Sequence, residues 1–151
     1  MLASLLVLAA SSTGTIAEPP LQPWAALIGH CWEGQAPGNS GIDKHCFESV
    51  YGGQHIRDRH VVTVGGREVY AGESIYSAKG AQVIFTYWNS LGGLGTGSAD
   101  LTGTEWRFNG TIHATATAAE EPMTAVWKIG SDAYEVTAEG GAPRLFKRSD
   151  R

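Results

Sequence analysis

Turn-forming dipeptides recur along this 151-residue chain, and they restrict its fold more than any other feature. Most contain glycine, which adopts the positive φ values that two-residue hairpin turns require. Between them, β-branched and aromatic residues recur at alternate positions, a pattern typical of β-strands. The turn signals are Gly52-Gly53, Gly65-Gly66, Lys79-Gly80, Thr102-Gly103, Asn109-Gly110 and Ser131-Asp132, with a longer loop over residues 36–41. Each signal predicts a hairpin between two antiparallel strands.

A series of hairpins this long predicts an all-β fold. About 8–10 strands joined in sequence form an up-and-down meander, which exposes two sheet edges unless it closes on itself. With 20 glycines and only 17% charged residues, the composition also argues against a helical bundle and against disorder. We therefore expect one domain over residues 28–148, an antiparallel meander closed into a barrel.

The charge distribution excludes two classes of partner. The formal net charge is −4, and the 11 basic residues are spread along the chain without a cluster. Nucleic acids and anionic membranes are bound through concentrated positive charge. We therefore expect neither as a partner.

The N-terminal segment resembles a secretory signal peptide. Residues 1–17 carry no charge, residues 2–10 are apolar, and small residues precede Glu18. The apolar run is too short to span a membrane. We expect cleavage after residue 17, an extended segment over residues 18–27, and a periplasmic or secreted protein with no membrane span. The alternative is an apolar N-terminal tail on a cytosolic protein.

The midpoint of each hairpin predicts which residues face one another across neighbouring strands. Opposite charges fall opposite each other in several hairpins, which supports the predicted register because such pairs stabilise a sheet. The predicted pairs are Cys31 with Cys46, Glu33 with Lys44, Glu48 with Arg57, Trp106 with His113, and Lys128 with Glu135.

Cys31 and Cys46 are predicted to form a disulfide. Their β-carbons lie close together in this register, and an exported protein folds in an oxidising compartment. Two alternatives remain, a pair of buried thiols and a redox-active pair influenced by the nearby Arg59.

The register also divides the side chains of the first five strands between two faces. One face carries the matched ion pairs together with Tyr70, Tyr76, Phe85 and Tyr87, and we assign it to the outside because such pairs favour water. The other face is assigned to the interior, where a ligand would bind. Its candidate ligand-binding residues are Trp32, His45, Phe47, Asp58, His60, Glu73 and Trp88. A single β-bulge would invert the two faces, in which case the cavity is lined by Arg57, Arg59, Tyr70 and Tyr87 and its expected ligand is an anion.

Asp58 and Glu73 fall directly opposite each other in the predicted interior, an arrangement that costs free energy. A shared proton, a bound cation, or charge on His45 and His60 would offset this cost. Two histidines and two carboxylates between Trp32 and Trp88 are suited to orienting a polar ligand or to acid–base chemistry. The same residues also form ordinary buried hydrogen bonds in many proteins.

The start of the predicted first strand, Leu27-Ile28-Gly29-His30-Cys31-Trp32-Glu33-Gly34, resembles the opening strand of calycin-type barrels, which include lipocalins, fatty-acid-binding proteins and nitrobindin-like barrels. The resemblance covers this strand alone. It implies an up-and-down barrel in which Trp32 closes the floor. Nitrobindin-like barrels place a haem-ligating histidine late in the chain, whereas no histidine follows His113 here, so haem is not expected.

Three functions are compatible with these patterns. The first is an exported barrel that binds a small, partly apolar molecule in a mixed aromatic and polar pocket. The second is a small enzyme that uses the histidine and carboxylate cluster as acid and base. The third is an interaction protein with a filled barrel. The sequence favours binding, and it assigns no catalytic residue, no cofactor and no oligomeric state. It also assigns no metal ligand, and two cysteines are too few for a four-thiolate zinc site.

Overall fold

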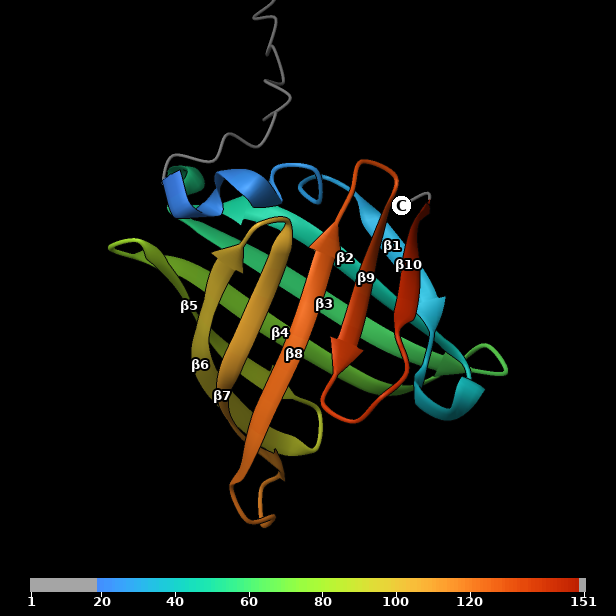
Figure 1. The fold of residues 1–151 in the computed structure, drawn as a ribbon. Coiled ribbons are helices and arrows are strands. Elements are labelled where there is room, and N and C mark those ends of the chain that lie inside the picture. Colours follow the sequence, from blue (N-terminus) through green and yellow to red (C-terminus); the bar gives the residue numbers. More distant parts are fainter. Residues whose placement is uncertain (1–18, 150–151) are drawn as a thin grey trace, which may run out of the picture.

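The computed structural model describes residues 19–149, in which ten antiparallel strands form a closed barrel (Figure 1). Each strand pairs with its neighbour in sequence, and β1 pairs with β10 to complete the ring. This confirms the predicted all-β fold and is compatible with a calycin-like barrel. The signal peptide predicted over residues 1–17 lies outside the described residues.

The strands are β1 (Cys31–Gln35), β2 (Ile42–Val50), β3 (His55–Val64), β4 (Arg67–Lys79), β5 (Gln82–Asn89), β6 (Gly92–Thr102), β7 (Glu105–Thr115), β8 (Glu121–Ile129), β9 (Ala133–Ala138) and β10 (Arg144–Ser149). Two single-turn 3-10 helices, η2 (Pro37–Asn39) and η3 (Tyr51–Gly53), lie in the first two hairpin connections. No helix among residues 19–149 is long and apolar enough to cross a membrane.

A 3-10 helix, η1 (Pro19–Trp24), covers one end of the barrel, in the region where we expected an extended segment (Figure 1). Leu21, Trp24 and Leu27 are fully buried and belong to the same hydrophobic core as the aromatic residues inside the barrel. The indole of Trp24 packs against the rings of Tyr76 and Trp106, at centroid distances of 4.4 and 5.4 Å. This end of the barrel is therefore closed by an apolar plug.

The register of the first three strands agrees with the prediction. Glu33 pairs with Lys44, and their charged atoms are 3.2 Å apart. Arg57 donates a 2.7 Å hydrogen bond from Nε to Glu48. Both ion pairs are partly exposed, as expected for the outer wall.

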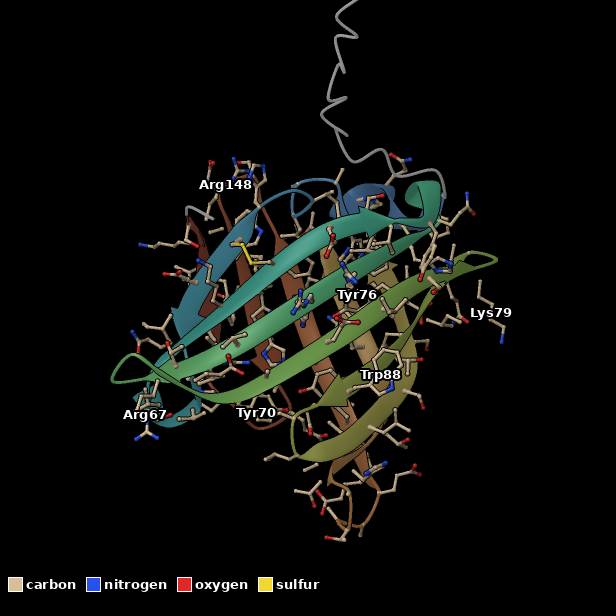
Figure 2. All side chains as sticks on the ribbon, turned by 180° about the vertical axis from the view of Figure 1, so that it is seen from behind. Arg67, Tyr70, Tyr76, Lys79, Trp88 and Arg148 are labelled. Carbon is tan, nitrogen blue, oxygen red and sulfur yellow. A yellow bond between two sulfur atoms is a disulfide. The ribbon has the colours of Figure 1, made fainter. Side chains whose placement is uncertain are left out.

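The predicted disulfide between Cys31 and Cys46 is present and links β1 to β2 (Figure 2).

Reducing the disulfide between Cys31 and Cys46 is expected to lower the free energy of unfolding by about 3 kcal/mol, because the unfolded chain regains the entropy of a 15-residue loop. For a chain of this size the melting temperature should fall by about 10 °C. Thermal melts with and without reductant measure the change, and the Cys31→Ser/Cys46→Ser double variant serves as a reductant-insensitive control. An unchanged melting temperature in the unsubstituted protein would contradict the prediction.

A β-bulge between β3 and β4 makes the predicted pairing of Asp58 with Glu73 wrong. The register shifts between Val62 and Thr63, where β4 carries one extra residue. Asp58 therefore lies opposite Ser74, and Glu73 lies opposite Arg59. Because side chains alternate between the two faces of a strand, one extra residue exchanges the faces of all that follows in β4 and β5.

The Asn109-Gly110 sequence is not a turn, so the predicted pairing of Trp106 with His113 is also wrong. Asn109 and Gly110 both lie inside β7, where Gly110 faces Gly97 of β6. A β-carbon on Gly110 would lie 2.2 Å from the carbonyl oxygen of Thr96, so the two strands approach closely only because glycine is present. His113 instead pairs with Leu94.

Candidate functional site

The barrel interior contains a polar cluster on β2 and β3. Strand alternation directs Asp43 and His45 of β2 inward, and Asp58 and His60 of β3 inward beside them. His45 pairs directly with His60, and their rings stack at a centroid distance of 4.5 Å. Asp43 and Asp58 are 3% and 2% exposed, so their charges must be compensated within the protein.

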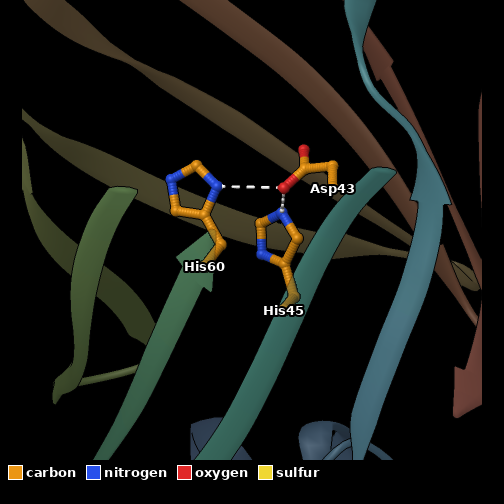
Figure 3. A group of neighbouring side chains, drawn as sticks. All are labelled: Asp43, His45 and His60. Atoms are coloured by element: carbon orange, nitrogen blue, oxygen red, sulfur yellow. Dashed lines mark hydrogen bonds and ion pairs between the residues drawn. The ribbon is translucent and has the colours of Figure 1, made fainter. Parts of the chain in front are cut away.

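His45 lies between the two carboxylates. Its Nδ1 is 2.8 Å from Oδ2 of Asp58, and its Nε2 is 3.3 Å from Oδ1 of Asp43. The same oxygen of Asp43 is 3.1 Å from Nδ1 of His60 (Figure 3). The four side chains therefore form one connected network.

Two further contacts extend this network. Arg144 of β10 donates a 3.2 Å hydrogen bond to Oδ2 of Asp43. On the other side, Nε2 of His60 is 3.3 Å from the hydroxyl of Tyr87, which is in turn hydrogen-bonded to the hydroxyl of Tyr70. The network thus runs from the partly exposed Tyr70 to the buried Asp58.

The network alters the pKa values of its members. Burial disfavours the charged form of His45, but the charge of Asp58 and the hydrogen bonds to both carboxylates outweigh it and raise the pKa of His45 to about 9. Burial also opposes ionisation of Asp43, yet the hydrogen bonds from His45 and His60 hold the pKa of Asp43 well below its usual value. Burial and the hydrogen bond with Tyr70 raise the pKa of Tyr87 above its ordinary value.

A cavity of about 260 Å³ lies beside the polar cluster. The cluster and Arg144 form its polar wall. The other wall is aromatic and aliphatic, and its members are Tyr76, Phe85, Phe108, Ile112, Met123, Ala125 and Trp127. Ile112 and Met123 are partly exposed, as are Tyr70 and Tyr87, so the cavity has contact with solvent on that side. The η1 plug closes the opposite end, since Trp24 contacts Trp127 and Phe108.

The structure distributes the seven predicted ligand-binding residues over three environments. His45, Asp58 and His60 line the cavity. Trp32 and Phe47 are almost fully buried in the core without lining the cavity, and the indole of Trp32 donates a 3.3 Å hydrogen bond to the carbonyl of Leu27.

Glu73 and Trp88, the remaining two, lie on the outer wall because of the bulge in β4. Trp88 is 44% exposed and pairs with Glu73, whose carboxylate faces Arg59 with 3.6 Å between the charged atoms (Figure 2). The assignment of both residues to the interior is therefore wrong. The same shift brings Tyr70, Tyr76, Phe85 and Tyr87 into the interior, where they line the cavity.

Three further residues complete the site. Asp43 stands two positions before His45 on the same strand, and this spacing places both on one face. Gly72 lies opposite His60, and a β-carbon on Gly72 would be 2.3 Å from Nε2 of that ring, so glycine leaves room for the imidazole. Arg144 is distant in sequence, and only closure of the barrel brings it to Asp43.

A scan against protein-family models finds no matching family, and a search of curated proteins finds no match. The function is therefore inferred from the geometry of the cavity.

Proposed function

We propose that this protein binds a small, partly apolar organic molecule inside the barrel. The observation that supports this proposal is the cavity of about 260 Å³, which has one polar wall and one aromatic wall. Such a combination is typical of ligand pockets, where apolar surface provides affinity and a few polar groups fix orientation. A cavity remains beside the packed aromatic core, so an interaction protein with a completely filled barrel fits the structure less well.

The chemistry of the walls indicates the type of ligand. The volume is slightly below the range of about 300–1,000 Å³ for drug-sized ligands, so the occupant is the size of one or two rings. Trp127 and Phe108 offer flat apolar surface to such rings. The guanidinium of Arg144 and the hydroxyl of Tyr87 offer hydrogen-bond donors to a carboxylate or hydroxyl substituent.

The protein is proposed to act after export, in the periplasm or outside the cell. The disulfide between Cys31 and Cys46 supports this location, because disulfides persist in oxidising compartments.

Filling the cavity is expected to weaken ligand binding strongly. Ala125 lines the cavity, whereas the next residue of β8, Val126, does not. Calorimetric titration with 2-naphthoate, a two-ring carboxylate, should give at least tenfold weaker binding for Ala125→Phe than for the unsubstituted protein. Val126→Phe adds an aromatic ring next to the same position and should bind normally. Equal affinity in all three proteins would place the ligand outside the barrel, and no binding of 2-naphthoate or of 2-naphthol to the unsubstituted protein would contradict an aromatic ligand.

A further inference from the structure

Three side chains of the polar cluster each place one possible metal donor atom within 4.8 Å of the other two. Figure 3 shows one nitrogen of each histidine facing the same carboxylate oxygen, and these atoms are Oδ1 of Asp43, Nε2 of His45 and Nδ1 of His60. The carboxylate oxygen is 3.3 Å from the first nitrogen and 3.1 Å from the second. Tetrahedral zinc ligands at about 2.0–2.1 Å from the metal are separated by about 3.3 Å. Two of the three donor separations therefore already match a metal site.

Each of the three side chains also has its second polar atom held by an outer partner. Nδ1 of His45 contacts the carboxylate of Asp58, and Nε2 of His60 contacts the hydroxyl of Tyr87. Oδ2 of Asp43 accepts the hydrogen bond from Arg144. Histidines that bind metals almost always donate a hydrogen bond from the N–H of their other ring nitrogen to a carboxylate, a backbone carbonyl or a water, and metal-binding carboxylates are likewise hydrogen-bonded.

From this geometry we propose that Asp43, His45 and His60 bind a divalent transition metal of the zinc type. Two imidazoles and one carboxylate form a donor set that zinc accepts in proteins. The three residues lie on the cavity wall, so the remaining coordination position faces the cavity. The site does not depend on the proposed organic ligand, and it predicts metal binding in the absence of any such ligand.

The charges of the neighbouring groups specify what completes the coordination. Coordination uses the lone pairs on Nε2 of His45 and Nδ1 of His60, so both imidazoles bind the metal in their neutral form. The total positive charge of the metal and Arg144 then exceeds the total negative charge of the Asp43 and Asp58 carboxylates by one unit. An anion, either hydroxide or an organic carboxylate, balances this excess at the open position.

Metal binding is tested on the protein purified without a polyhistidine tag and dialysed against a chelator. Titration calorimetry with Zn²⁺ alone should show one site per chain, and Co²⁺ should give the intense visible absorption of a four- or five-coordinate ion. His60→Ala should weaken Zn²⁺ binding at least 100-fold. The matched control is His55→Ala on the same strand, since His55 is hydrogen-bonded to Ser77 and is outside the three-residue group, so it should bind Zn²⁺ normally.

A second variant keeps the proposal testable if His60→Ala does not fold. Asp58→Asn retains the shape of a side chain that touches His45 but not the metal, and should weaken Zn²⁺ binding about 10–100-fold. Absence of saturable Zn²⁺ binding in the unsubstituted protein would overturn the proposal, as would equal loss of binding in His55→Ala. Binding of 2-naphthoate without Zn²⁺ binding would overturn the metal site and leave the proposed function intact.

Discussion

Trp24→Ala is expected to lower the free energy of unfolding by about 3–5 kcal/mol, the usual cost of truncating a fully buried tryptophan. The indole lies at the centre of an aromatic cluster, with ring centroids of Tyr76, Trp127 and Phe108 at 4.4, 5.5 and 5.9 Å. Alanine would leave a void that the closed barrel cannot collapse to fill, since hydrogen-bonded strands hold the walls apart. Chemical denaturation monitored by circular dichroism measures the loss.

Trp24→Phe is the matched control for this variant. Nε1 of Trp24 has no hydrogen-bond partner among the described residues, so phenylalanine removes no hydrogen bond and retains most of the aromatic contact. Its cost should be well below that of alanine. A cost below about 1 kcal/mol for Trp24→Ala would mean that η1 does not plug the barrel in solution.

Asp43→Ala is expected to destabilise the chelator-treated protein by about 3–5 kcal/mol. Removing one partner of a buried ion pair leaves the other charge uncompensated, and Asp43 contacts Arg144, His45 and His60 at once. The carboxylate is almost fully buried, so water cannot replace it without opening the barrel. Urea denaturation measures this change in the free energy of unfolding.

An exposed ion pair provides the comparison for Asp43. Glu33→Ala breaks a contact with Lys44 whose charged atoms are also close, but both side chains are more than a third exposed. Its cost should stay below about 1 kcal/mol, because solvent screens such pairs. Similar costs for the two variants would show that burial does not strengthen the polar cluster.

The β1–β3 region could be predicted from sequence because its turns are unambiguous. The loop over residues 36–41 and the Gly52-Gly53 turn fix the register by symmetry, so Cys31, His45 and His60 receive their correct partners. The residues of the polar cluster on β2 and β3 follow from this register and from strand alternation.

The errors begin at the first irregularity that the turn pattern does not encode. The turn at Gly65-Gly66 is correct, yet the bulge that follows shifts β4 by one residue and moves Glu73 and Trp88 to the outer wall. A bulge has no strong sequence signature, because the extra residue is accommodated by local twist rather than by a particular side chain.

The predicted turn at Asn109-Gly110 was wrong for a different physical reason. The dipeptide favours a tight turn, but the same absence of a β-carbon also allows two strands to approach closely, as Gly110 and Gly97 do. Arg144 was not predicted because its contact with Asp43 depends on the register between β1 and β10, which no hairpin connects.

That junction between β1 and β10 affects how the chain can assemble. Cys31 pairs with Ser149, so the first strand acquires its second neighbour only after the last strand has been added. Until then β1 and β9 present unpaired backbone groups, to which another copy of the chain can add a strand. Loss of β10 by proteolysis or premature termination would therefore convert a self-contained cylinder into an open sheet prone to aggregation.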